Sequence, residues 1–138
     1  MTLGPAEAGD GFQFRRVDLP DTPSIPADVE HVHQTQRATT LRVDDAEVHT
    51  IEHVLASFVG MGIDNATVEL GSAEPPVADG SSVIYNDMIR SVGVLEQDRE
   101  RATYTVSRPI YYESGESILT VFPASERRVC CVSGDADG

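Results

Sequence analysis

The sequence predicts an α+β fold: a two-layer sandwich of a small, mostly antiparallel sheet with two helices, followed by the opening strands of a second, similar domain. Three observations predict it. Two segments carry apolar residues at helical spacing. Neighbouring segments alternate apolar and polar residues, which is typical of half-buried strands. After Glu96, strand-like segments continue without a helix. We therefore expect a first α+β domain over residues 1–97, then a linker and the incomplete start of a second domain over residues 98–138.

Extended structure is expected at the start of the chain. Residues 1–10 are small and acidic, with Gly and Pro, and predict a frayed lead-in. The alternating segment Gly11–Val17 predicts a strand. Three prolines in Leu19–Ala27 predict an extended connection, because proline fixes φ and disfavours helix.

A hairpin and the first helix follow. The segments Thr39–Val43 and Ala46–Val48 flank Asp44-Asp45, which predicts two paired strands and a turn. Beyond them, a helix is expected to end at the glycines 60 and 62. Its apolar stripe consists of Ile51, Val54, Leu55, Phe58 and Val59.

The second helix is expected after another strand and a loop. Asn65–Leu70 alternates as a strand does, and Gly71–Gly80 reads as a loop. Asp79 or Ser81 can cap the helix Ser81–Val92, and Gly93 can end it. Its apolar face consists of Ile84, Tyr85, Met88, Ile89 and Val92.

Strands without helices are expected in the remaining chain, after a charged linker at Leu95–Arg101. The strand-like segments are Tyr104–Val106, Ile110–Tyr112, Ile118–Phe122 and Val129–Val132. Asp135-Ala136-Asp137-Gly138 resembles the opening of a calcium loop, but the later Glu that such a loop requires is absent.

Composition excludes several classes of partner. The formal net charge is −13, and all ten basic residues are arginine. This acidic balance argues against a nucleic-acid partner and against an anionic membrane surface. We expect no transmembrane segment, because no apolar run approaches the roughly 20 residues that span a bilayer. Cys130 and Cys131 are adjacent and form no Cys-x-x-Cys pair, and residues 1–11 lack the features of a signal peptide, so we expect a reduced, cytoplasmic chain.

One face of the first helix is unusual. Opposite the apolar stripe lie Ala56, Ser57, Gly60 and His53, with Glu52 at the flank, where a surface helix normally carries charged residues. We expect another element to cover this face, with His53 and Glu52 facing the seam. A polar-face or satisfied core histidine is the alternative.

Two other functions remain open on these residues. His49, Glu52 and His53 match H-x-x-E-H, the pattern of an inverted-zincin metallopeptidase, which needs both histidines one turn apart on a helix. However, His49 precedes the helical periodicity. The other alternative is a non-catalytic interaction domain that uses the acidic surface and the bare helix face. His31 and His33 are expected at the surface.

Thr50–Leu55 together with Gly60–Asn65 resembles the signature of the UDP-3-O-acyl-N-acetylglucosamine deacetylases, the zinc amidases of lipid A biosynthesis. Glu74–Ser81 resembles the family's E-x-P-x-x-D-G-S block, and Arg37–Leu41 lies where the family has a comparable segment. The resemblance covers about residues 12–122.

The resemblance implies two similar domains that face each other across the active site. It implies that Glu52 is the general base and that His53 is one of three protein ligands of Zn²⁺, the others being a His and an Asp of the second domain. The implied reaction removes the N-acetyl group of a UDP-sugar lipid precursor as acetate. Because no histidine follows His53, we expect a truncated chain that is inactive without a second domain in cis.

Overall fold

The computed structural model describes residues 1–133 and divides the chain into two compact units, Met1–Arg101 and Ala102–Gly138. The α+β class is confirmed: two helices pack against one mixed and one antiparallel sheet in the first unit, and a hairpin forms the second. The calcium-loop-like residues 135–138 lie outside the described part. Whether residues 98–138 begin a second, similar domain stays a prediction.

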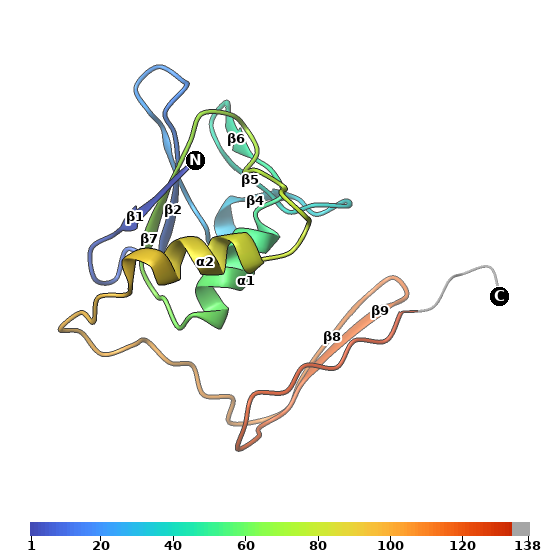
Figure 1. Ribbon diagram of the computed structural model, residues 1–138. Coiled ribbons are helices and arrows are strands. Elements are labelled where there is room, and N and C mark those ends of the chain that lie inside the picture. Colours follow the sequence, from blue (N-terminus) through green and yellow to red (C-terminus); the bar gives the residue numbers. More distant parts are fainter. Residues whose placement is uncertain (134–138) are drawn as a thin grey trace. The chain divides into compact units, whose positions relative to one another are not determined.

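A four-stranded sheet forms one part of the first unit. It consists of β1 (Thr2–Pro5), β2 (Phe12–Arg16), β3 (Ser24–Pro26) and β7 (Ala66–Leu70) in the order β1-β7-β2-β3. β1 pairs antiparallel with β7, and β2 pairs antiparallel with β3, whereas β2 and β7 run parallel (Figure 1). The sheet is therefore mixed, with a single parallel pair at its centre.

The expected frayed lead-in is wrong for its first half. β1 pairs along β7, with Leu3 opposite Val68, and Met1 and Leu3 pack against the core. Its partner lies more than 60 residues away in the sequence, so no local pattern of apolar residues announces this strand. Proline is tolerated at Pro5 because β1 is an edge strand.

A second, three-stranded antiparallel sheet follows a short 3₁₀ helix at Val29–His31. Its strands are β4 (Val32–Gln34), β5 (Thr40–Val43) and β6 (Ala46–Val48). The expected hairpin is confirmed, with Val43 opposite Ala46 and Asp44 at φ +51° in the turn.

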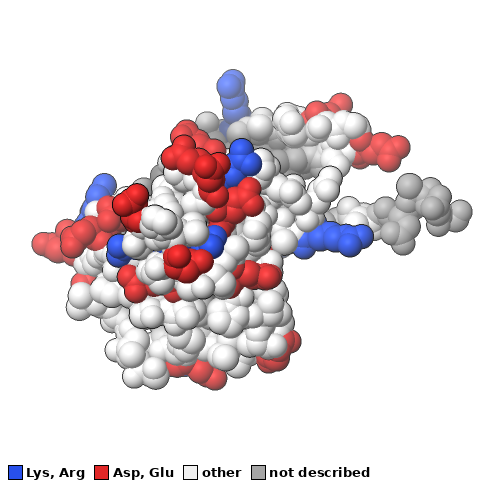
Figure 2. Space-filling model, turned by 90° about the horizontal axis from the view of Figure 1, so that it is seen from above, with Lys and Arg blue, Asp and Glu red and all other residues white. Residues whose placement is uncertain are grey.

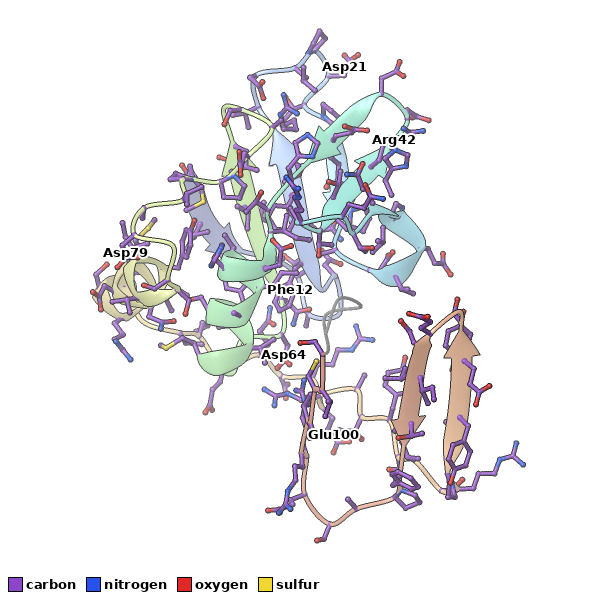
Figure 3. All side chains as sticks on the ribbon, turned by 90° about the vertical axis from the view of Figure 1, so that its right-hand side faces the viewer. Phe12, Asp21, Arg42, Asp64, Asp79 and Glu100 are labelled. Carbon is purple, nitrogen blue, oxygen red and sulfur yellow. The ribbon has the colours of Figure 1, made fainter. Side chains whose placement is uncertain are left out.

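The two helices, α1 (Glu52–Gly60) and α2 (Val83–Val92), contact each other and close the core (Figure 1). Phe12, at the start of β2, lies beside α1, with its ring centroid 5.0 Å from that of Phe58 (Figure 3). The buried core draws on both sheets and both helices: Phe14, Ile25, Leu41, Ala46, Val48, Ile51, Val54, Phe58, Ala66, Val68, Leu70, Tyr85 and Ile89.

The expected apolar faces of the helices are partly wrong. On α1, Val59 is exposed and Ser57 is buried, because Ser57 faces α2 and donates a hydrogen bond to Asn86 Oδ1 (2.6 Å). On α2, Ile84 and Val92 are exposed although their helical spacing places them on the expected apolar face. The spacing of apolar residues in one helix does not show from which side the neighbouring helix packs.

The second unit is described by itself. Its strands β8 (Ile110–Ser114) and β9 (Ser117–Val121) form an antiparallel hairpin, and their side chains are exposed. The expected strands at Tyr104–Val106 and Val129–Val132 do not form. Within residues 102–133, neither segment has a neighbouring strand to pair with. A strand without a partner would leave its backbone N–H and C=O groups without hydrogen bonds. Across residues 1–133, no helix is long and apolar enough to cross a bilayer.

Candidate functional site

The entrance of α1 is built on a strained turn. The chain leaves β6 at Val48, and α1 begins at Glu52. Between them Thr50 has φ +54°, a left-handed conformation that β-branched residues rarely adopt. Ile51 is buried and its carbonyl accepts from the amide of Leu55 (3.0 Å), which anchors the first turn in the core. The helix start is thereby held firmly against the sheet.

Glu52, the expected general base, is exposed at this helix start. Its Oε1 accepts a hydrogen bond from the backbone amide of Thr39. Partial burial raises the pKa of the Glu52 carboxyl, but hydrogen bonds from its own amide and from Thr39 more than offset this, so that the pKa lies below its usual value. The carboxylate is therefore ionised at neutral pH and able to accept a proton.

His53, the expected zinc ligand, follows directly and is half-buried. Within residues 1–133 its imidazole makes no hydrogen bond, so the lone-pair nitrogen of the neutral ring is available to a ligand. Glu52 and His53 thus lie side by side at one end of α1, and both reach the surface. The arrangement offers a proton acceptor and a nitrogen donor within one short stretch.

His49 is placed outside the helix, which argues against the inverted-zincin pattern. Its Nδ1 lies 3.0 Å from Thr40 Oγ1, and its Nε2 lies 3.7 Å from Glu47 Oε2. The left-handed Thr50 separates it from α1, so His49 and His53 do not stand one turn apart on a helix, as that chemistry requires.

Zinc is suited to the donor that His53 offers, because a neutral imidazole is one of its ordinary ligands. However, residues 1–133 contain no group of three His, Cys, Asp or Glu side chains that could hold a metal. That His53 is one ligand of a zinc site therefore stays a prediction.

The expected cover over the small-residue face of α1 is partly provided by α2. Ser57 is 1% exposed and bonded to Asn86. In contrast, Ala56 and Gly60 are exposed along with Glu52. Part of the small-residue face, together with Glu52, is therefore exposed, and this exposed part carries no Lys or Arg.

The loop before α2 contacts the helix entrance. The amide of His49 donates to the carbonyl of Ala73 (2.8 Å), which lies three residues after β7 ends at Leu70. Further along, Asp79 Oδ1 accepts from the Ser81 amide (2.9 Å) and hydroxyl (2.8 Å), which holds the turn before α2 (Figure 3). The bond between His49 and Ala73 joins the two residues that directly precede the sequence blocks Thr50–Leu55 and Glu74–Ser81.

One contributor escaped sequence reasoning. The sequence predicts only that Thr39 belongs to a strand, yet its backbone amide contacts the Glu52 carboxylate. No residue type signals such a contact, because every residue except proline carries the same donor.

On the face of the molecule shown in Figure 2, acidic side chains cover more of the surface than basic ones do. The formal charge of −13 is thus carried at the surface, with arginines dispersed among the carboxylates. Several arginines are paired with them, including Arg15 with Glu69 (3.3 Å) and Arg101 with Asp64 (2.8 Å).

Comparison with known proteins decides the family. The family model described as UDP-3-O-acyl N-acetylglycosamine deacetylase matches residues 1–135. The chain belongs to this family. The deacetylase family is zinc-dependent, and the resemblance drawn from the two sequence blocks is confirmed.

Curated relatives agree. The chain is 41% identical to the UDP-3-O-acyl-N-acetylglucosamine deacetylase of Nostoc sp. over 126 residues, which are 90% of this chain and 45% of the relative. It is 41% identical to that of Thermosynechococcus vestitus over 129 residues (94% and 45%). It is 40% identical to that of Myxococcus xanthus over 131 residues (95% and 42%). The chain therefore spans less than half the length of these deacetylases.

Proposed function

We propose that this chain supplies the general base, Glu52, and one zinc ligand, His53, to a deacetylase that hydrolyses the N-acetyl group of UDP-3-O-acyl-N-acetylglucosamine. The observation that carries the proposal is the adjacency of an ionised carboxylate and an available imidazole at the surface end of α1. Membership of the deacetylase family supports the reaction and the substrate class.

The chemistry requires a base and a metal that act on the same water molecule. Zinc, when bound, lowers the pKa of water and polarises the amide carbonyl. Glu52 accepts a proton from the attacking water as the oxygen of that water bonds to the acetamide carbon. The protonated Glu52 then returns that proton to the leaving nitrogen as the C–N bond breaks. Acetate and the free amine of the sugar are the products, and the carboxylate is regenerated.

The remaining zinc ligands are proposed to come from a second domain in the same longer protein. Residues 1–133 offer His53 but no cluster that would complete the coordination. The relatives are more than twice as long as the part that this chain matches. We accordingly expect the 138-residue chain alone to bind zinc weakly and to show no amidase turnover.

The test uses a chimera in which residues 1–121 of this chain replace the matching part of the Nostoc deacetylase. Glu52→Gln should abolish turnover, about 10²–10⁴-fold or more for loss of a general base, and should keep zinc. His53→Gln should lose zinc as well as turnover. Zinc content and the rate of acetate release are measured together.

Two matched controls separate the alternatives. Glu47→Gln removes a carboxylate from the neighbouring strand β6 and should leave turnover and zinc intact, because the Glu47 side chain pairs with Arg42 and His49 and not with Glu52 or His53. His49→Gln should also keep zinc, whereas the metallopeptidase alternative requires its loss. A folded chimera in which Glu52→Gln turns over at the wild-type rate would contradict the deacetylase assignment.

We further propose a cytoplasmic location. Cys130 and Cys131 are both exposed thiols outside any disulfide. Exposed thiols are typical of a reducing compartment. The proposal predicts that an antibody or fluorescent tag on the longer protein fractionates with cytoplasmic markers rather than with secreted ones.

A further inference from the structure

We propose that the backbone amide of Thr39 is a positioning group for the general base: it holds Oε1 of Glu52 and thereby turns the other carboxylate oxygen toward the attacking water. This inference rests on the proposed function of Glu52. It assigns a role to residues 39–40, a segment that supplies no reacting group in the proposed mechanism.

Two contacts tie this segment to the helix entrance. The Thr39 amide donates to Glu52 Oε1, and Thr40 Oγ1 lies 3.0 Å from His49 Nδ1. They fall on opposite sides of Thr50, the residue at φ +54°. The segment therefore holds the strained turn on both sides, and the direction of the first residue of α1 is fixed by β5 rather than by α1 alone.

The Thr39 amide is outside the β-ladder. The ladder between β4 and β5 begins at Thr40, opposite Gln34, and Thr39 immediately precedes β5. Before it, Arg37 at φ +64° turns the chain into this position. The Thr39 N–H is consequently not used in sheet pairing, and it donates to the carboxylate of Glu52 instead.

A backbone donor suits this task because it has no side-chain rotamers to order. Thr40 is 5% exposed and Leu41 is 1% exposed, so the peptide that carries the donor is anchored in the core. Groups that are held before the reaction need no reorganisation during it. The exposed Glu52 side chain, by contrast, has several rotamers and would lose precision without this contact.

The first experiment uses the chimera described above. Thr39→Pro removes the N–H, Thr39→Ala keeps the N–H but removes the hydroxyl, and Thr39→Ser keeps both. Thr39→Pro should lower kcat by about 10–100-fold, since a small displacement of a catalytic group is costly, with KM and zinc content unchanged. Thr39→Ser should retain wild-type kcat, and Thr39→Ala should lie much nearer to Thr39→Ser than to Thr39→Pro.

The two proposals fail differently. If Glu52→Gln keeps turnover, the proposed function is wrong. If Glu52→Gln abolishes turnover while a folded Thr39→Pro keeps full kcat, only the positioning role is wrong. A fall in kcat that is matched by a rise in KM or by loss of zinc would also overturn the positioning role, because it would indicate general damage to the site.

The second experiment needs no activity and no proline. In the 138-residue chain, hydrogen exchange at the Thr39 amide is followed by nuclear magnetic resonance. Glu52→Ala should accelerate it by about tenfold, because the amide loses its acceptor, whereas Glu47→Ala should leave it unchanged. Equal exchange rates in wild type and Glu52→Ala would overturn the inference.

Discussion

At the scale of single residues, Arg16 joins the two sheets of the first unit. Its Nε and Nη2 donate to the two oxygens of Asp18 (2.8 Å each), and its Nη1 donates to the carbonyl of Glu47 in β6 (2.6 Å). The planar guanidinium suits this bidentate geometry, which a lysine cannot reproduce. A residue that is only 8% exposed thus stabilises the contact between β2 and the hairpin that leads into the candidate site.

The pair predicts a pH-dependent stability. The hydrogen bond from Arg16 holds the pKa of the Asp18 carboxyl below its ordinary value of 3.8. A carboxyl whose pKa is depressed on folding stabilises the protein above its unfolded pKa, and this contribution is lost as the pH falls through the folded pKa. Asp18→Asn should therefore lower the free energy of unfolding at neutral pH, and its effect should shrink once the pH falls below the ordinary Asp value. Urea unfolding at a series of pH values measures it.

The matched control is Arg16→Met. In that background the pH-dependent part of the Asp18→Asn effect should disappear, because the donor that depresses the pKa is gone. A pH-dependent effect that persists without Arg16 would contradict this assignment.

Sequence reasoning at this scale names candidate residues but not the contacts around them. Glu52 and His53 lie on a helix face that lacks the usual charged residues, and the family resemblance assigns them roles that stay predictions. The contact made by the amide of Thr39 could not be predicted, since a backbone donor has no sequence signature. The burial of Ser57 could not either, because it depends on Asn86 of a helix 29 residues away.

At the scale of elements, α1 ends in a tight left-handed turn. The amide of Gly62 donates to Val59 O (3.2 Å) and that of Ile63 to Phe58 O (2.9 Å), which is the Schellman pattern. Gly62 has φ +72° at the position where this pattern requires it. The turn fixes where the chain leaves the helix and enters β7.

Gly60 and Gly62, two positions apart, should respond oppositely to substitution by alanine. Gly62→Ala should destabilise the protein by about 1–2 kcal/mol, the cost of a Cβ in the left-handed region. Gly60→Ala should stabilise it by up to about 0.5 kcal/mol, because alanine is the better helix former at a helical position. The space around a Cβ at Gly60 is open, so no clash offsets the gain. Chemical denaturation of both variants checks the pair, and a shared sign would count against the helix end described above.

Elements with a local signal were predicted well. The hairpin of β5 and β6, the strand β7 and both helices follow from short patterns of apolar residues and turns. β1 could not be found in this way, because its stability comes from β7, which is remote in sequence. The strands expected at Tyr104–Val106 and Val129–Val132 show the opposite error: apolar residues alone do not make a strand without a partner.

At the scale of the whole molecule, the two units differ in how much they bury. The core draws entirely on residues 1–101, whereas the side chains of β8 and β9 are exposed. A two-stranded hairpin is marginally stable by itself in water. Exposed apolar residues of this unit, among them Ile118 and Leu119, would also favour association.

Limited proteolysis should reveal this difference. A non-specific protease should cut the 138-residue chain first within residues 102–133 and leave a resistant fragment that ends near Arg101. Mass spectrometry of the early products identifies the sites. Early cleavage in β2 or β7, or protection of β8 and β9 equal to that of the core strands, would contradict the expectation.

Residues near the two ends of the first unit are bonded to one another. Gln97 Nε2 donates to Ala6 O (2.8 Å), and Asn65 accepts from the amides of Gly9 and Gly11 (2.9 Å each) while donating to Gln97 Oε1 (2.8 Å). Chain ends that meet in this way are the condition for circular permutation and for insertion into a host protein. Residues 1–101 should accordingly tolerate a short peptide that joins position 101 to position 1, with new termini opened at the Asp44-Asp45 turn. Such a permuted protein would allow the helix entrance to be studied without residues 102–138.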